Sequence, residues 1–338
     1  MPAVLLALGW LAAHAAAAGG ASLPDSLGAA TARDTLAAFA AAAPGPRFEP
    51  GPVLGRSEHP RERLVEPAGV ATDAFGRVYV TDAATHRLAR WDAEGRWLDE
   101  AGSLGSEANE FRRPGAVARL GSLGVAVLDV ENRRVVTYNL ELHLLGVLAE
   151  FGTSEFEASL GVVSAIGLAA DRGGAVYVAD ADGDRVLAFD FSGRFLRAIG
   201  GHGEGEGRLR SLAAVAVAPQ GVLVTADRPR ERGPVRLQWF DAGGRVTRVA
   251  FAPAPAAGAR RRPEALSLAV DDSGRVALAD EGAGAVELLG PAGEPLARLE
   301  GLDRPSGLAF APDGSLLDAE RGAGRVRRFV PRPLATGE

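Results

Sequence analysis

Residues 166–190 read Ile166-Gly-Leu-Ala-Ala-Asp171, then Val176-Tyr-Val-Ala-Asp180, then Arg185-Val-Leu-Ala-Phe189-Asp190. A second copy of this phrase runs from Pro67 to Asp92. The position of its arginine recurs six times, 47, 51, 51, 49 and 40 residues apart, at Arg87, Arg134, Arg185, Arg236, Ala285 and Arg325. A fixed period of this size is typical of a solenoid, a propeller or another repeat array.

Each copy contains four short strand patterns separated by turns and no convincing helix. In the copy quoted above we expect strands at about 165–171, 175–180, 185–190 and 195–201. Four such strands form one antiparallel sheet, and six sheets arranged radially form a β-propeller. The sequence therefore predicts an all-β fold, a six-bladed β-propeller of four-stranded antiparallel blades.

The last copy supplies only three strands before Pro331. The segment Arg47–Gly55, which precedes the first copy, has the pattern of an outermost strand. We expect this N-terminal strand to complete the last blade by pairing with residues 325–330. Such a closure leaves no long sheet edge exposed.

The repeated phrase resembles the NHL repeat family. The matching motifs are Pro-x-Gly-Val-Ala at Pro67, Val-Tyr-Val-Ala-Asp at Val176, Asp-Arg-Val at Asp184 and Gly-Gly-x-Gly at Gly200. The resemblance covers residues 47–331 and implies a six-bladed propeller without specifying a ligand. A WD40 propeller is the competitor because Trp91-Asp92 is present, but that dipeptide occurs once and without the rest of the signature.

Two segments precede the repeats. Residues 1–20 hold an apolar stretch followed by Ala-x-Ala sequences, as in a secretory signal peptide, although a basic start is missing. Residues 21–46 are Ala-rich and indicate a helix or linker, and residues 332–338 form a tail. We expect a periplasmic or extracellular protein, anchored at its N-terminus if the signal is not cleaved and without stable membrane insertion if it is.

The charge and the amino-acid composition exclude several kinds of binding and catalysis. The formal net charge is −6, which gives no support for DNA binding or general attraction to anionic membranes. The absence of cysteine excludes disulfides, thiol nucleophiles and cysteine-bound metals. We expect a monomer that uses no cofactor.

The expected innermost strands carry no Asp, Glu, His or Asn, and Arg119 is their one charged residue, with its orientation toward the channel left open. Calcium requires oxygen ligands, and zinc in a chain without cysteine requires convergent histidines. The histidines are scattered, with His86 and His202 in separate repeats. We therefore expect no metal and no catalytic residues.

Acid and arginine pairs recur five residues apart across a turn. They are Asp82/Arg87, Asp129/Arg134, Asp180/Arg185 and Glu320/Arg325. Because the spacing repeats from blade to blade, we interpret the pairs as structural, with each carboxylate accepting turn N–H groups. The aromatic residues four positions after the arginines are expected to be buried wedges between blades.

One repeat departs from the others by an insertion after Asp227, which carries Arg228, Arg230 and Arg232. The connector to the next repeat adds Arg260, Arg261 and Arg262. We hypothesise that these six arginines form a basic patch on the loop face for a protein partner or an anionic ligand. The simpler interpretation is two solvated arginine-rich loops.

The sequence thus predicts a secreted, non-catalytic binding or scaffolding propeller. The alternative is a hydrolase or lyase that works at the mouth of the central channel. Single-stranded RNA binding is a third hypothesis, which the negative charge and the signal-like segment oppose.

Overall fold

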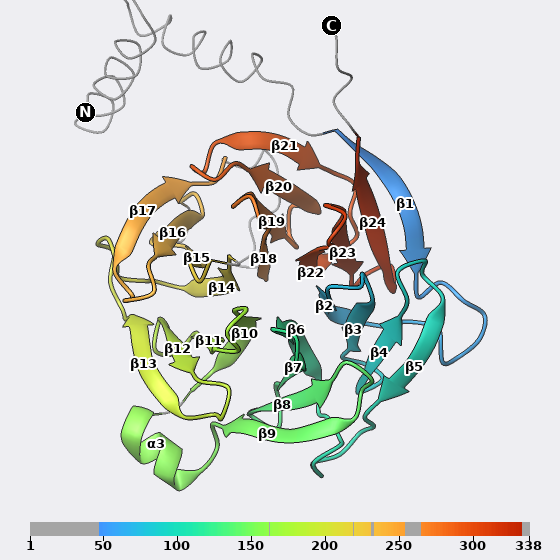
Figure 1. Cartoon of the computed structure of the whole chain (residues 1–338). Coiled ribbons are helices and arrows are strands. Elements are labelled where there is room, and N and C mark those ends of the chain that lie inside the picture. The colour runs from blue at the N-terminus through green and yellow to red at the C-terminus, as the bar shows by residue number, and fades with distance from the viewer. Residues whose placement is uncertain (1–46, 162, 219, 231–232, 254–264, 333–338) are drawn as a thin grey trace, which may run out of the picture. The chain divides into compact units, whose positions relative to one another are not determined.

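The computed structural model describes residues 47–332 except 162, 219, 231–232 and 254–264. Six four-stranded antiparallel sheets stand around a central channel, as Figure 1 shows. The predicted fold class is confirmed. The expected signal segment, the linker, Arg232 and Arg260–Arg262 lie outside the described residues. Within the described part, no helix is long and apolar enough to cross a membrane.

The first three blades follow the chain directly, each from the innermost to the outermost strand. Blade 1 consists of β2 (Pro67–Thr72), β3 (Val78–Asp82), β4 (Arg87–Trp91) and β5 (Trp97–Ala101). Blade 2 consists of β6 (Pro114–Leu120), β7 (Gly124–Asp129), β8 (Arg134–Asn139) and β9 (Leu144–Glu150). Blade 3 consists of β10 (Ala165–Ala170), β11 (Val176–Asp180), β12 (Arg185–Phe189) and β13 (Phe195–Gly200). These bounds lie within one residue of those expected for residues 165–201.

The other three blades complete the ring. Blade 4 consists of β14 (Leu212–Val217), β15 (Leu223–Asp227), β16 (Arg236–Phe240) and β17 (Val246–Phe251). Blade 5 consists of β18 (Leu266–Val270), β19 (Val276–Asp280), β20 (Ala285–Leu289) and β21 (Pro295–Leu299). Blade 6 consists of β22 (Pro305–Phe310), β23 (Leu316–Glu320), β24 (Arg325–Pro331) and β1 (Phe48–Leu54).

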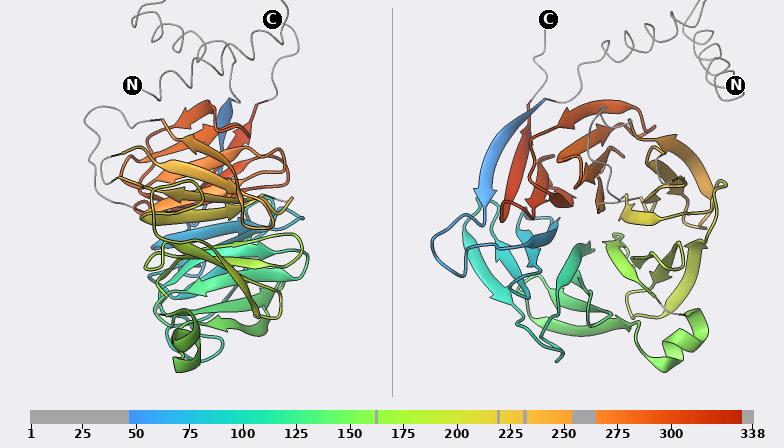
Figure 2. Two further views of the ribbon diagram at one scale, coloured as in Figure 1. Left: turned by 90° about the vertical axis from the view of Figure 1, so that its left-hand side faces the viewer. Right: turned by 180° about the vertical axis from the view of Figure 1, so that it is seen from behind.

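The closure by the N-terminal strand is confirmed. β1 pairs antiparallel with β24, with Phe48 opposite Pro331 and Leu54 opposite Val326. The two strands lie side by side in both views of Figure 2, although they come from opposite ends of the ring sequence. The last blade thus has no unpaired outer edge at β24.

The acid and arginine pairs are structural, as predicted. In blade 2, Asp129 accepts the backbone N–H of Arg112 and lies 2.9 Å from Arg134 Nε. Arg134 also donates to three backbone carbonyls of the preceding connector. Each buried pair therefore joins a turn to the loop that enters the blade, satisfying polar groups that would otherwise be costly to bury.

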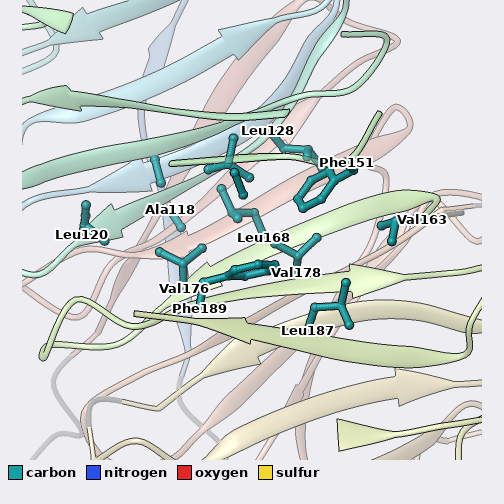
Figure 3. Close-up of a cluster of buried hydrophobic side chains, with 13 residues drawn as sticks. Ala118, Leu120, Leu128, Phe151, Val163, Leu168, Val176, Val178, Leu187 and Phe189 are labelled. Carbon is teal, nitrogen blue, oxygen red and sulfur yellow. The ribbon is translucent and has the colours of Figure 1, made fainter. Parts of the chain in front are cut away.

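The core lies between neighbouring blades. Figure 3 shows the cluster that joins blades 2 and 3, where Leu128 and Phe151 meet Leu168, Val178 and Phe189. The aromatic residues predicted as wedges are all buried: Trp91, Tyr138, Phe189, Phe240 and Phe329. Each contributes a large apolar area to this packing.

One element differs from the sequence prediction. A short helix, α3 (Ser154–Leu160), lies in the connector between blades 2 and 3, where no helix was expected. Thr153 caps it by accepting the N–H of Phe156, and the Phe156 ring packs on Phe151 at 5.4 Å between centroids. A helix of two turns is too short to give a clear apolar period in the sequence.

Candidate functional site

The six innermost strands run in the same direction along the channel and give it two different ends. We call the end where these strands begin the first mouth, and the end where they finish the second mouth. The connectors between blades and the turns between the second and third strands surround the first mouth. Propellers offer concave sites at such channel ends.

A cavity of about 530 Å³ occupies the first mouth. Its charged lining residues are Arg228 and Arg321, and Ser211, Ser267 and Ser306 add hydroxyl groups. The rest of its lining is formed by small and apolar residues. Val130 and Ile166 are 39% and 42% exposed there. The volume lies in the usual range for small-molecule sites.

One position of the repeat differs in polarity from blade to blade at this mouth. It is the residue directly after the acid that ends each blade's second strand. In blade order the residues are Ala83, Val130, Ala181, Arg228, Glu281 and Arg321. Blades 1 to 3 are therefore small or apolar at this position, and blades 4 to 6 are charged. Of these residues Val130, Ala181, Arg228 and Arg321 line the cavity, so a ligand there would meet apolar side chains from blades 2 and 3 and cations from blades 4 and 6.

Arg321 is held between two carboxylates. Its Nε lies 3.7 Å from Glu66 Oε1, and its Nη1 lies 3.8 Å from Glu281 Oε1. Both distances are too long for direct hydrogen bonds. The buried Nε of Arg321 has no hydrogen-bond partner in the structure. The guanidinium thus lies between two carboxylates at ion-pair distance, without a direct hydrogen bond to either.

Glu281 is itself held by Arg304, which lies in the connector between blades 5 and 6. Its side chain is only 7% exposed, and Arg304 Nε donates to its Oε1 at 2.8 Å. Glu66 accepts in the same way from Arg113 at 3.2 Å. Arg321 therefore belongs to one connected network of charges, which consists of Arg113, Glu66, Arg321, Glu281 and Arg304.

Of the six arginines predicted to form a basic patch, the structure describes only Arg228 and Arg230. Arg228 lies at the first mouth, 3.4 Å from Asp280 of blade 5. Blade 5 carries Ala285 where other blades carry the paired arginine, so Arg228 supplies the missing cation from the neighbouring blade. Arg230 is exposed. Arg232, Arg260, Arg261 and Arg262 lie outside the described residues, and the basic patch stays a hypothesis.

The histidines occupy separate loops. His86 Nδ1 accepts the backbone N–H of Arg113, and His202 Nδ1 lies 2.7 Å from Asp184 Oδ2. No group of three or more His, Asp or Glu side chains suited to a metal ion occurs among the described residues. Among the described residues of the first mouth, the candidate reactive groups are therefore Arg321 and the carboxylates beside it.

Glu66, Glu281, Arg304 and Arg321 were not among the predicted site residues, because the prediction of catalytic groups rested on the innermost strands and on the histidines. These residues lie in the turns and connectors beside those strands. Arg119, whose orientation was open, does face the channel, at the second mouth. An alignment of the six copies at the position after each acid would have revealed Glu281 and Arg321.

No family model matches the chain. Among curated proteins it is 27% identical to Protein brain tumor from Drosophila melanogaster over 140 residues, which is 41% of this chain. The chain matches only 13% of the length of that protein. This likeness is distant and partial.

Solved structures of similar fold include several enzymes. A gluconolactonase from Xanthomonas campestris has a TM-score of 0.58 at 12% identity, covering 86% of this chain and 99% of its own. A streptogramin B lyase has a TM-score of 0.57 at 12% identity, covering 85% and 98%. A luciferin-regenerating enzyme has a TM-score of 0.57 at 10% identity, again covering 85% and 98%. At such identities the likeness establishes the fold.

The comparisons contradict the prediction of a non-catalytic binding or scaffolding module. Propellers with this fold include a lyase and a gluconolactonase, so the alternative of a channel-mouth enzyme has the better support. The physical reason for the error is that bare innermost strands do not imply a bare channel mouth. Turns and connectors bring Arg321 and its carboxylates to the first mouth.

Proposed function

We propose that the protein is an enzyme of the hydrolase or lyase class that cleaves an ester or lactone at the first mouth. The observation that carries this proposal is the Arg321 guanidinium, which lines a cavity of about 530 Å³ and lies between the carboxylates of Glu66 and Glu281. The fold neighbours named as a gluconolactonase and a lyase support the class. Fold alone would not suffice.

The chemistry follows from where charge develops. Attack of water on a lactone carbonyl places negative charge on the carbonyl oxygen, and elimination places it on the departing carboxylate. A fixed guanidinium stabilises either charge without needing to reorganise. In the proposed reaction, Arg321 contacts this oxygen and Glu281 holds Arg321 in position. Glu66, the carboxylate beside Arg321 Nε, is the proposed proton acceptor.

A lactone turnover assay tests the proposal. The panel consists of δ-gluconolactone, δ-valerolactone and aromatic lactones, and proton release measures ring opening. We expect the protein to open at least one of them faster than the spontaneous reaction. Arg321→Gln should reduce the rate about 10²–10³-fold, as for removal of one oxyanion donor. Product mass separates the two classes, because hydrolysis adds one water and elimination adds none.

Arg96→Gln is the matched control, because Arg96 is 77% exposed in a turn of blade 1. This variant should turn over the same lactone at the rate of the unchanged protein. Equal rates for Arg321→Gln and the unchanged protein would contradict the role of Arg321. Failure of every lactone to react would contradict the substrate class.

We also propose that the chain is related to the NHL repeat proteins. The repeated motifs and the partial likeness to Protein brain tumor, an NHL protein, support this relationship. It carries no statement about the reaction.

A further inference from the structure

The second mouth holds a separate cavity of about 560 Å³. Six structurally equivalent residues line it: each pairs with the residue that lies four positions before the acid at the end of its blade's second strand. In blade order they are Thr72, Arg119, Ala170, Val217, Val270 and Phe310. One cation therefore stands in a ring of otherwise apolar or small side chains.

Among the described residues, Arg119 has one hydrogen-bond acceptor and no carboxylate at ion-pair distance. Its Nε donates to the Gly121 carbonyl at 2.7 Å. Within the described part of the chain, no carboxylate oxygen lies within the 4.0 Å that defines an ion pair with Arg119. An arginine placed beside apolar surface is costly unless its donors are satisfied, and a planar carboxylate satisfies two at once.

The acids that line the same cavity are already engaged. Asp73 pairs with Arg77 and Asp271 pairs with Arg275, each at 2.6 Å. Asp171 accepts the N–H of Ala175 and the hydroxyl of Tyr177. Arg119 thus remains the lining cation that has no fixed anion, which favours an external one.

An exposed ion pair spans part of this mouth. Arg172 of blade 3 lies 2.8 Å from Asp272 of blade 5, and their side chains are 63% and 78% exposed. Solvent-exposed ion pairs contribute little to stability, so this one would open easily to admit a ligand.

We propose that the second mouth binds a carboxylate with an apolar body. The carboxylate pairs with Arg119, and the apolar body packs on Val217, Val270 and Phe310. Burial of the body strengthens binding about fourfold per methylene, so affinity should rise with chain length. This site is independent of the first mouth and of the reaction proposed there.

Titration calorimetry with sodium octanoate tests this inference. We expect the unchanged protein to bind octanoate well, sodium acetate at least about tenfold more weakly, and octylammonium chloride not measurably. Arg119→Gln should weaken octanoate binding at least about tenfold, which corresponds to about 1.4 kcal/mol. Phe310→Ala should weaken octanoate binding while leaving the preference for an anion.

Arg194→Gln is the matched control, because Arg194 lies in a turn of blade 3, is 76% exposed and does not line the cavity. It should bind octanoate as the unchanged protein does. Undiminished binding by Arg119→Gln, or loss of binding only in Arg321→Gln, would overturn the proposal. If Arg119→Gln does not fold, the comparison of octanoate with octylammonium decides, and equal affinities would overturn it.

Discussion

Deletion of residues 1–56 is expected to lower the melting temperature by about 10 °C or more, or to cause aggregation. This deletion removes β1, whose Leu54 is buried in the core that joins blades 1 and 6. It also removes the backbone ladder to β24 and exposes that strand as an edge. Loss of one buried leucine alone costs about 2–5 kcal/mol. Thermal unfolding followed by circular dichroism measures the effect.

Deletion of residues 1–44 is the matched control. The chain divides into the units Met1–Pro44 and Gly45–Glu338, so this cut leaves β1 in place. Its melting temperature should stay close to that of the unchanged protein. A synthetic peptide of residues 45–56 should partly restore the stability of the longer deletion, whereas a scrambled peptide should not. Equal melting temperatures for the two deletions would refute the closure.

The fold could be predicted because its information is local and repeated. Each blade carries an acid before its turn, Asp in five blades and Glu320 in the sixth, and the other five copies reveal the pattern where one departs from it, as with Ala285 in place of arginine. The pairing of β1 with β24 was also predictable, since the last copy lacks one strand and an open edge is unfavourable. The short helix α3 was not, because its stability comes from the packing of Phe156 on Phe151.

The candidate site was less predictable because it depends on contacts between blades. Glu66 and Arg321 are 255 residues apart in the sequence, yet ring closure brings them to within 3.7 Å. Arg228 was identified as a basic residue, but its pairing with Asp280 depends on the loss of arginine at position 285. Such pairings follow from the geometry of the ring and leave no mark in any single repeat.

Asp318 is the residue that fits its blade least well. It lies in the middle of β23, is fully buried, and neither carboxylate oxygen has a hydrogen-bond partner in the structure. The other blades carry mostly apolar residues at this position: Val80, Val127, Val178, Thr225 and Leu278. Burial, followed by the nearby charge of Glu320, raises the pKa of Asp318 to about 8. The side chain is therefore mostly protonated in the folded protein at pH 7.

Asp318→Val is accordingly expected to stabilise the protein at pH 7. The unfolded chain ionises Asp318 near its ordinary pKa of 3.8, whereas the folded protein must keep the proton up to about pH 8. Each pH unit in that window costs about 1.4 kcal/mol of folding free energy, so the penalty at pH 7 is at most about 4 kcal/mol. Denaturant unfolding should give a higher free energy for the variant and a melting temperature several degrees higher.

The pH dependence provides the sharper test, because it isolates the proton from the packing. Stability associated with Asp318 is fully present below pH 4, falls as the pH rises from 4 to 8, and is constant above that. Asp318→Asn keeps the side-chain shape but cannot ionise. The stability difference between Asp318→Asn and the unchanged protein should therefore grow in favour of the variant from pH 4 to pH 8. A difference that stays flat across this window would mean that Asp318 ionises normally in the folded protein, with its charge compensated inside blade 6.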